Sequence, residues 1–571
     1  MSTKLLNKKR IERDFPKTWD VNDLLNRVQY HGDKVLYKYF VGKDVLEMTY
    51  AEFYAYVKKI SAAITAKGLC GKKIAVIGET SPEWLATYVA CLASGAVVVP
   101  MDKELAITEI EKFLTIIEAD AIVYSKSFND KFTSTIETHP TVKYFIPMSY
   151  EGEASDKIIP LSTLVELGAA EVEAGYTFKA VANRDEMCEM LFTSGTTGTS
   201  KCVMLSQKNI FAAVSSAIDT VCFEADDVLV SVLPVHHTYE LMCLLAEMVI
   251  GCTTCINDSL RHVIKNFARF KPTGLVLVPL FLNTMYKKIW SEAEKSGKTG
   301  VLKTAIKLSH GMLAVGIDLR RTLFKSVLDA FGGNLNKIIC GGAKLNPELV
   351  EGFEDFGISV YEGFGITECS PLVAVTPYTA RKLGSIGPAV TSCTMRIDPN
   401  GDLTAEGYVM GEIQVKGDNV MIGYYNNPEA NADVFTEDGW FRTGDVGYLD
   451  ADGYAFITGR IKFVIVLENG KNVFPEEIEE YLEGIDTIAE SCVIGRKSPD
   501  SDEVILTAVV FPNYAKFPEG SSDEDVKESI RKSINAVNKK LPTFKQIKSV
   551  EVRKTEFEKT TTKKIKRQLV K

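Results

Sequence analysis

Short apolar runs alternate with helical patterns over most of the chain. Lys73–Ile77 is an apolar run of strand length, a helical pattern follows from Pro82, and Val97–Val99 is the next apolar run. Further runs of the same kind lie at residues 121–124, 228–233, 274–278 and 337–340. Strands that alternate with helices in this way form mostly parallel sheets covered by helices, so the pattern predicts an α/β fold.

The pattern changes after about Leu383. The strands become shorter and are separated by Gly-Asp and Asp-Gly turns at residues 401–402, 438–439 and 452–453. Turns of this composition join antiparallel strands, so they favour a barrel-like subdomain in this part of the chain.

A last unit begins near Ile461. It combines a helical pattern at 475–482, an apolar run at 504–511 and a helix that Ser521 opens, with Glu524 completing a capping box. The organisation therefore predicts a large N-terminal domain, residues 1–460, that contains the barrel-like part. It also predicts a small α+β C-terminal domain, residues 461–571.

Length, charge and cysteine content narrow the classes of function. A chain of 571 residues exceeds what one hydrophobic core supports, and its net charge of −9 argues against nucleic acid as the main partner. The twelve cysteines are scattered, and no apolar leader precedes a cleavage-like site, which indicates a reducing, cytoplasmic location. Cys252 and Cys255 have no second pair at zinc spacing, and we interpret them as core thiols.

Two apolar stretches resemble membrane spans in composition. Residues 84–101 contain Ser94-Gly95 and then Pro100, which favours a buried helix, a turn and a strand. Residues 241–256 contain Glu247 and are interrupted by Gly251. A span needs about 20 apolar residues without such interruptions, so no transmembrane helix is expected. A peripheral membrane contact and a homodimer stay open.

The first chemical motif is a loop rich in Gly, Ser and Thr that follows the apolar run 187–192. It reads Thr193-Ser194-Gly195-Thr196-Thr197-Gly198-Thr199-Ser200-Lys201. Glycines let backbone N–H groups turn toward an anion, hydroxyls add donors, and Lys201 supplies a positive charge, so the loop predicts a phosphate site. It lacks the spacing of a P-loop, and the alternative is a flexible linker.

Two further motifs are weaker on their own. In Tyr361-Glu362-Gly363-Phe364-Gly365-Ile366-Thr367-Glu368, the glycines leave room for a planar ring, Thr367 offers a donor to phosphate and Glu368 a ligand for Mg²⁺. In Gly439–Asp445 and Thr458-Gly459-Arg460, Asp445 offers acceptors for ribose hydroxyls and Arg460 a further contact. The alternative for this last motif is a hairpin with a structural Asp–Arg pair.

The motifs and their order resemble the adenylate-forming (AMP-binding) superfamily of acyl- and aryl-CoA synthetases, peptide adenylation domains and insect luciferases. TSGTTGTSK, YEGFGITE, GWFRTGDVGYLDADGYAFITGR and VIVLENGKNVFPEEIE stand in the family order, and the resemblance runs from about Thr49 to Arg567. The last segment is most similar to long-chain fatty-acyl-CoA synthetases. The resemblance implies ATP, Mg²⁺ and coenzyme A as cofactors and a carboxylic acid, such as a medium- or long-chain fatty acid, as substrate.

The resemblance also implies roles for individual residues. The loop from Thr193 to Lys201 would hold the β- and γ-phosphates, and Gly341, Gly342 and Ala343 would lie beside adenine and the acyl chain. Tyr361 would stack near adenine, Thr367 would contact the α-phosphate, and Glu368 would bind Mg²⁺. Asp445 and Arg460 would hold the ribose, and His237 would lie near the substrate carboxylate. For His237 the alternative is a packed, hydrogen-bonded histidine.

A catalytic lysine near the C-terminus completes the resemblance. Aligning the Thr, Ile and Arg of Glu558–Arg567 with the family pattern selects Lys564. Glu558 and Lys563 depart from the residues that the pattern has at these positions. Because Lys563 and Lys564 are adjacent, Lys563 is the alternative. The family rotates its C-terminal domain about a hinge that falls on Lys462, which would bring a surface around Gly470 to the site for thioester formation.

The alternatives for the whole protein are an aryl-acid ligase, an adenylation enzyme with another acceptor, or a nucleotide-binding regulator.

Overall fold

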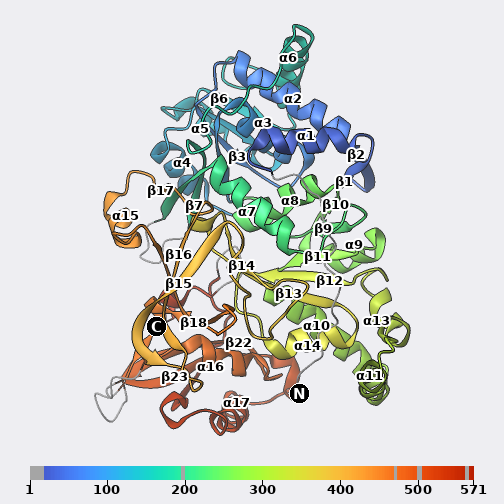
Figure 1. The fold of residues 1–571 in the computed structure, drawn as a ribbon, viewed down its shortest axis with the longest axis vertical. Coiled ribbons are helices and arrows are strands. Elements are labelled where there is room, and N and C mark those ends of the chain that lie inside the picture. The colour runs from blue at the N-terminus through green and yellow to red at the C-terminus, as the bar shows by residue number, and fades with distance from the viewer. Residues whose placement is uncertain (1–17, 194–199, 468–471, 498–503, 560–564, 571) are drawn as a thin grey trace. The chain divides into compact units, whose positions relative to one another are not determined.

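The computed structural model describes residues 18–193, 200–467, 472–497, 504–559 and 565–570. The chain divides into two compact units, which we describe separately (Figure 1). The first comprises Met1–Met395 and Val415–Phe441, and the second comprises Arg396–Gln414 and Arg442–Lys571. The boundary expected between residues 460 and 461 stays a prediction.

One sheet of the first unit has the strand order β14-β13-β12-β11-β9-β10-β1-β2. From β1 to β13 neighbouring strands are parallel, and β2 and β14 are antiparallel to theirs. The strands are β1 (Val35–Val41), β2 (Asp44–Thr49), β9 (Val228–Ser231), β10 (Thr253–Ile256), β11 (Gly274–Leu277), β12 (Lys337–Gly341), β13 (Ser359–Gly365) and β14 (Leu372–Val375).

A further sheet of the first unit has the order β17-β8-β7-β4-β3-β5-β6. Strands β4, β3, β5 and β6 are parallel, whereas β7–β8 and β8–β17 are antiparallel pairs. The strands are β3 (Lys73–Ile77), β4 (Val97–Met101), β5 (Ala121–Tyr124), β6 (Tyr144–Pro147), β7 (Met187–Thr193), β8 (Lys201–Ser206) and β17 (Gly423–Tyr424). Each predicted strand of the N-terminal part is present, and the α/β fold with mostly parallel sheets is confirmed.

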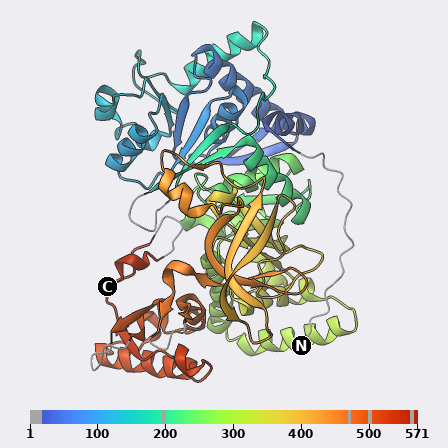
Figure 2. The same cartoon turned by 60° about the vertical axis from the view of Figure 1, so that its left-hand side comes forward.

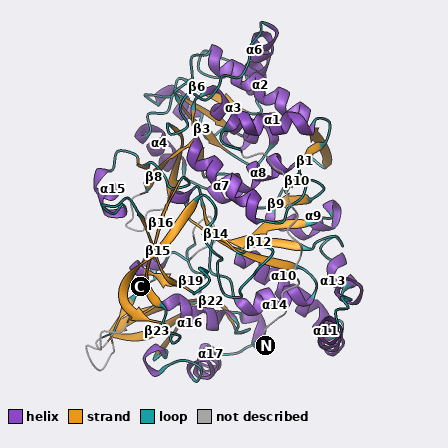
Figure 3. Ribbon diagram, viewed as in Figure 1, coloured by secondary structure: helices purple, strands orange, loops and turns teal. Residues whose placement is uncertain are grey.

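Helices cover these sheets (Figure 3). Helix α2 packs against α6 and α3, and α3 packs against β3 and β4 (Figures 1 and 2). The helices of the first unit are α1 (Val21–His31), α2 (Tyr50–Ala66), α3 (Pro82–Ser94), α4 (Ile107–Ile116), α5 (Thr133–Thr138), α6 (Leu161–Glu173), α7 (Gln207–Thr220), α8 (Thr238–Ile250), α9 (Val263–Phe270), α10 (Pro279–Lys295), α11 (Thr299–Ala314), α12 (Arg320–Leu323), α13 (Lys325–Asp329), α14 (Pro347–Asp355) and α15 (Pro428–Val434).

The two apolar stretches fold as helix, turn and strand. Helix α3 begins with Ser81 as its N-cap and Pro82 in its first turn, and it ends at Gly95, whose φ of 75° is left-handed. Helix α8 ends in the same way at Gly251, with a φ of 98°, before β10. Within the described ranges, no helix combines the length and the apolar character that crossing a bilayer requires.

The longest described strands of the chain lie in the second unit, so the shorter strands expected after Leu383 are not observed. Strand β15 (Cys393–Leu403) has 11 residues and continues through Gly401-Asp402, where a turn was expected, whereas the described strands of the first unit have at most 7. Among the described residues of the second unit, two segments are α-helical. The part expected to be barrel-like is a sheet of order β15-β16-β18-β19, and β22-β23-β24 form another sheet. The elements that lie wholly or mostly in the second unit are β15 (Cys393–Leu403), β16 (Val409–Gly417), β18 (Phe441–Leu449), β19 (Ala455–Arg460), β20 (Ile465–Val466), β21 (Asn472–Val473), α16 (Pro475–Glu483), β22 (Ile488–Lys497), β23 (Val504–Pro512), α17 (Asp523–Asn538) and β24 (Ser549–Val552). The capping box of α17 is formed by Ser522 and Asp525, one residue later than predicted.

Helix α8 carries two buried carboxyl groups. Ser231 donates a hydrogen bond to Glu240, and Thr254 Oγ1 donates to Glu247 Oε2 at 2.5 Å. Burial in apolar surroundings raises the pKa of Glu240 to about 8 and that of Glu247 to about 7. Both carboxyl groups therefore hold a proton at mildly acidic pH, where an exposed glutamate has released it.

The stability of the protein should depend on the protonation of Glu240. Between pH 4.5, its ordinary pKa, and pH 8 the folded protein holds a proton that the unfolded chain releases, so stability falls as pH rises. The loss is at most about 1.4 kcal/mol for each pH unit from one carboxyl group. Glu240→Gln stays neutral, so we expect a shallower decline in urea-unfolding free energy between pH 5.5 and 8.

Glu109→Gln, at an exposed position of α4, is the matched control and should keep the slope of the unsubstituted protein. An unchanged slope in Glu240→Gln would show that this carboxyl group does not retain its proton.

Candidate active site

The parallel strands β12 and β13 end at the same edge of their sheet. Their register pairs Ile339 with Tyr361 and Gly341 with Gly363. The chain turns directly after β12 at Gly342, whose φ is 85°. A side chain at Gly341 would approach the carbonyl oxygen of Gly363 to 3.0 Å, so glycine keeps the two strand ends close. Ligands of open α/β sheets bind at such carboxyl edges.

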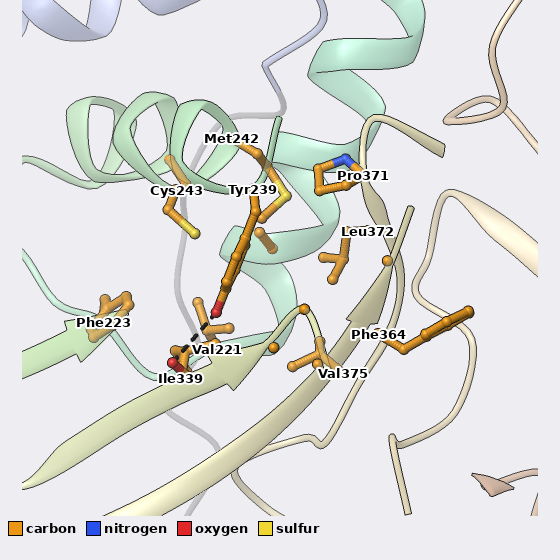
Figure 4. A pocket seen from close by; sticks show the side chains of 16 residues that line it. Val221, Phe223, Tyr239, Met242, Cys243, Ile339, Phe364, Pro371, Leu372 and Val375 are labelled. Carbon is orange, nitrogen blue, oxygen red and sulfur yellow. Dashed lines mark hydrogen bonds between the residues drawn. The ribbon is translucent and has the colours of Figure 1, made fainter. Parts of the chain in front are cut away.

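An apolar cavity of about 70 Å³ lies at this edge (Figure 4). Helix α8 lines one side through Tyr239, Met242 and Cys243, whose side chains point toward the strand ends. Helix α8 also contributes Ala246. The other lining residues come from α7 and the segment after it, from β12 and β13 with the residues that follow them, and from β14: Ala217, Val221, Phe223, Ile339, Gly341, Gly342, Gly363, Phe364, Gly365, Pro371, Leu372 and Val375.

Tyr239 crosses the cavity and is held loosely. Its hydroxyl lies 3.4 Å from the carbonyl oxygens of Leu277 and Ile339, beyond the usual hydrogen-bond length. Figure 4 shows the contact with Ile339. Burial raises the pKa of Tyr239 well above its ordinary value, so its hydroxyl stays protonated. The phenol therefore forms a neutral, displaceable wall.

Thr193 and Lys201, the described ends of the predicted phosphate loop, face each other in the β7–β8 hairpin. The register pairs the two residues, and Thr193 Oγ1 donates to the carbonyl oxygen of Lys201 at 3.3 Å. The hairpin thus brings both ends of the loop together. The residues between them that were assigned to phosphate, Ser194, Gly195, Thr196, Thr197 and Gly198, lie outside the described residues.

Tyr424 connects Lys201 with Glu368. The Lys201 ammonium lies 4.7 Å from the centre of the Tyr424 ring, a cation–π distance. The Tyr424 hydroxyl donates to Glu368 Oε1 at 2.8 Å. Burial and the nearby Glu368 carboxylate raise the pKa of Tyr424, which keeps its hydroxyl a donor. The structure therefore brings together two predicted site residues that are 167 positions apart in the chain, from 201 to 368.

Thr367 and Glu368 form the short helical turn that follows β13. The turn spans Thr367–Cys369 and ends at Ser370, which has a left-handed φ of 64°. Gly365 and Pro371, on either side of it in the chain, both line the cavity. The turn thus presents a hydroxyl and a carboxylate next to an apolar space.

Tyr361 and His237 lie away from the cavity lining. Tyr361 lies on β13 and is 5% exposed. Burial is the main cause that raises the pKa of Tyr361, and the nearby Cys222 raises it further. His237 is the N-cap residue of α8, half-buried, with its ring 4.2 Å from that of His236. His236 lies 3.6 Å from Asp102, and burial lowers its pKa so that it is neutral at pH 7. The roles assigned to Tyr361 and His237 stay predictions.

Asp445 and Arg460 form an ion pair in the second unit. They face each other in the β18–β19 ladder, and Arg460 Nε and Nη2 donate to Asp445 Oδ1 and Oδ2 at 2.6 and 3.2 Å. Asp445 is 3% exposed. The structural Asp–Arg pair is therefore present, and it orients a carboxylate that keeps lone pairs for further donors.

The segment around the predicted catalytic lysine is held at its described ends. Lys559 and Ile565 form an isolated β-bridge, Lys559 pairs with Glu490, and Arg567 pairs with the half-buried Glu479. Lys563 and Lys564 lie outside the described residues, as does Gly470. Lys462, the predicted hinge, is exposed in a short helical turn, Ile461–Phe463.

Known proteins share this architecture over nearly the whole chain. Residues 24–425 match the family described as AMP-binding enzyme, and residues 462–571 match the AMP-binding enzyme C-terminal domain. The first match alone covers well over half of the chain. The protein belongs to the AMP-binding enzyme family. The resemblance predicted from the sequence motifs is confirmed.

Relatives in the AMP-binding enzyme family differ in the acids that they are named for. The chain is 26% identical to long-chain-fatty-acid–CoA ligase FadD15 of Mycobacterium bovis, over 94% of this chain and 92% of that protein. It is 27% identical to feruloyl-CoA synthase of an Amycolatopsis species, over 81% and 83% of the two chains. The crystal structure of ATP-bound MatB from Rhodopseudomonas palustris is 25% identical, with a TM-score of 0.71 over 96% of this chain and 98% of that one.

Two residues of this AMP-binding enzyme emerge only from the structure. Phe364 lines the cavity between two predicted glycines, and Tyr424 links Lys201 to Glu368. Both are aromatic residues in strands, where a packing role explains the sequence pattern equally well. The glycines before Phe364 and Tyr424 are the one available signal, because glycine in a strand marks close backbone approach.

Removing the Tyr424 hydroxyl should weaken nucleotide binding. Tyr424→Phe keeps the ring beside Lys201 but loses the hydrogen bond that orients Glu368. A hydrogen bond to a charged group contributes about 1.5–3 kcal/mol, so we expect ATP affinity in the presence of Mg²⁺ to fall by at least about tenfold in calorimetric titration.

Tyr425→Phe is the matched control, because the Tyr425 hydroxyl accepts a hydrogen bond from Lys73 Nζ at 3.1 Å. If both variants bind ATP as the unsubstituted protein does, Tyr424 has no part in the nucleotide site.

Proposed function

We propose that this protein is an AMP-forming acid–thiol ligase, which activates a carboxylic acid with ATP and transfers the acyl group to coenzyme A. A medium- or long-chain fatty acid is the proposed substrate. The arrangement of Gly365, Thr367, Glu368 and Pro371 is the main support, because the polar turn lies between two cavity-lining residues. An acid with its apolar tail in the cavity would direct its carboxylate toward the groups proposed to bind phosphate.

In the first step a carboxylate oxygen attacks the α-phosphorus of ATP. A new P–O bond forms, the bond to the β-phosphate oxygen breaks, and pyrophosphate leaves, so that an acyl-AMP anhydride remains. Both reactants are negative, so the protein must align them and neutralise their charge. The loop from Thr193 to Lys201 is proposed to hold the β- and γ-phosphates, Thr367 the α-phosphate, and Lys564 the developing charge.

Glu368 is the proposed ligand for Mg²⁺. Its carboxylate is a hard oxygen donor, half-buried and fixed by the Tyr424 hydroxyl, which suits a cation that takes its other ligands from phosphates and water. When bound, the ion would neutralise negative charge on the phosphates. Glu368 would hold the ion, and Tyr424 would orient Glu368.

The Asp445–Arg460 pair is the proposed ribose site. Each carboxylate oxygen of Asp445 accepts one hydrogen bond from Arg460, and a carboxylate has about four acceptor positions. Two positions are thus left for two ribose hydroxyls. Arg460 would then orient the Asp445 carboxylate and leave its two other acceptor positions to the ribose. The proposed surroundings of adenine and of the first part of the acyl chain are Gly341, Gly342, Ala343, Tyr361 and Gly363. His237 is the proposed neighbour of the substrate carboxylate.

In the second step the thiol of coenzyme A attacks the acyl carbon. A C–S bond forms, the anhydride C–O bond breaks, and AMP leaves. The thiol needs space that Lys564 occupies in the first step, so we propose that residues 461–571 rotate about Lys462 and bring the surface around Gly470 to the acyl-AMP. The exposed position of Lys462 is consistent with a hinge.

The two half-reactions should separate in Lys564→Ala. Loss of a cation that stabilises the transition state should lower ATP–pyrophosphate exchange by at least about a hundredfold. The same variant should still convert supplied acyl-AMP and coenzyme A to thioester at close to the normal rate. Equal loss of both activities would contradict the assigned role.

Two variants control this experiment. Lys563→Ala tests the register, because loss of exchange in that variant alone would transfer the role to Lys563. Lys462→Pro fixes φ near −65° and should give the opposite result, with exchange retained and thioester formation lost. Normal thioester formation by Lys462→Pro would contradict the hinge.

The size of the cavity bears on the choice of acid. Pockets for small molecules usually enclose about 300–1,000 Å³, and the cavity of about 70 Å³ is smaller. A long acyl chain therefore requires side chains to move. Tyr239, whose hydroxyl makes two long contacts of 3.4 Å, is the side chain that we propose to move. An aryl acid requires less movement, and the feruloyl-CoA synthase relative makes it the second candidate.

A panel of acids tests the substrate and the role of Tyr239 together. Thioester and AMP formation would be measured with ATP, Mg²⁺, coenzyme A and acids from acetate to oleate, plus benzoate and cinnamate. We expect the highest kcat/KM for a medium or long chain, and Tyr239→Ala should shift the preference to longer chains by about tenfold or more, since it removes most of a buried side chain. Turnover of aryl acids alone would contradict the fatty-acid proposal.

A further inference from the structure

Helix α11, whose residues are all described, has an unusually exposed surface. Ser309 is its one buried residue, whereas a helix on a protein surface usually buries an apolar stripe against the core. Helices α10, α12 and α14 contact it, and Figure 1 shows it at the outer edge of the first unit. Most of the surface of α11 is therefore available to a partner.

The exposed side of α11 carries an apolar ridge. Val301 is 67% exposed, Leu308 is 54% exposed, and Val315, which directly follows the helix, is 71% exposed. Residues seven positions apart lie almost two full turns apart, so these three side chains share one face. We call Val301, Leu308 and Val315 the α11 ridge. Exposed apolar side chains that line up in this way mark a surface that another apolar surface covers.

The segment that carries the α11 ridge is basic, whereas the chain as a whole is acidic, and Asp355 of α14 contacts this segment at His310. Residues 295–317 contain four lysines, Lys295, Lys298, Lys303 and Lys307, and no Asp or Glu, while the chain has a net charge of −9. Lys295 pairs with Glu292 at 3.4 Å. In the described part of the protein, Lys298, Lys303 and Lys307 make no ion pair, so their charge is available to an external anion.

We propose that α11 docks this protein on an anionic lipid bilayer. A basic helix with an apolar face lies at a membrane interface, with its apolar side chains below the headgroups and its lysines among the anionic groups. A second copy of the chain is a poorer partner, because a symmetric contact would bring like charges together. An acidic protein is also a poorer partner, because segment 295–317 has no Trp, Tyr or Phe to anchor a protein interface.

The composition of the α11 ridge sets the strength of this docking. Three aliphatic side chains bury little area, so the apolar contact alone does not hold the protein on a neutral membrane. Binding then depends on the lysines together with anionic lipid, which makes it reversible and sensitive to salt. The proposal is independent of the acid that the enzyme activates.

Vesicle sedimentation of the full chain tests the proposal. One set of vesicles would contain phosphatidylcholine alone, and the other would contain about one third phosphatidylglycerol, which supplies the anionic surface. We expect the protein to pellet with the anionic vesicles, to stay in solution with the neutral ones, and to be released by about 0.5 M salt. Failure to bind anionic vesicles at low salt, or equal binding to both, would overturn the proposal.

Paired variants connect the binding to α11. Lys303→Glu with Lys307→Glu, and separately Val301→Ser with Leu308→Ser, should each weaken binding to the anionic vesicles by about tenfold or more. The matched controls are Lys527→Glu with Arg531→Glu, an exposed pair one turn apart on α17, and Leu403→Ser, which is 63% exposed. The controls should bind within about twofold of the unsubstituted protein.

ATP binding and far-ultraviolet circular dichroism of each variant show that the fold is retained, because α11 contributes no residue to the proposed site. Equal binding by α11 and control variants would overturn the proposal. So would a dimer that the Val301 and Leu308 substitutions dissociate while vesicle binding is unchanged.

Discussion

The parallel pairing of β12 with β13 determines where the cavity and the Thr367–Glu368 turn lie in the first unit. Because the strands run in the same direction, Gly341 and Gly363 come side by side at one edge of the sheet. A Cβ at Gly341 would lie 3.0 Å from the Gly363 carbonyl oxygen and 3.3 Å from the Tyr239 ring. The absence of side chains there leaves space for the cavity, and the chain that continues from β13 carries Thr367 and Glu368 next to it.

The fold was predictable from the sequence because its strands are buried on both faces. Strands such as β3 and β5 are continuous apolar runs, which the pattern identifies directly, and their alternation with helices implies parallel pairing. The start of α17 was predicted one residue too early, because Ser521-Ser522 and Glu524-Asp525 both fit the capping pattern. The Ser521 hydroxyl instead donates to the Pro518 carbonyl, which leaves Ser522 to cap the helix.

The candidate site was predictable where one segment contains the whole motif. Lys201, Glu368, Asp445 and Arg460 stand in recognisable local patterns. The structure adds the contacts within each unit, which connect Lys201 with Glu368 and Asp445 with Arg460. Tyr424 is the clearest case, because its contacts with Lys201 and Glu368 depend on the antiparallel pairing of β17 with β8, a long-range contact. In the same way, the exposure of Val301 and Leu308 on α11 depends on which elements pack beside the helix, and the sequence pattern alone does not show this.

Helix α8 shows how packing and chemistry share one element. Tyr239, Met242, Cys243 and Ala246 recur at spacings of three and four residues, so they form one face, and that face lines the cavity. Glu240 and Glu247, seven residues apart, lie on another face, where Ser231 and Thr254 donate to them. Burial raises the pKa of both carboxyl groups, so in mildly acidic solution these two groups of α8 are neutral. The apolar face of α8 thus lines the cavity, while the turn after β13 places the Thr367 hydroxyl and the Glu368 carboxylate next to it.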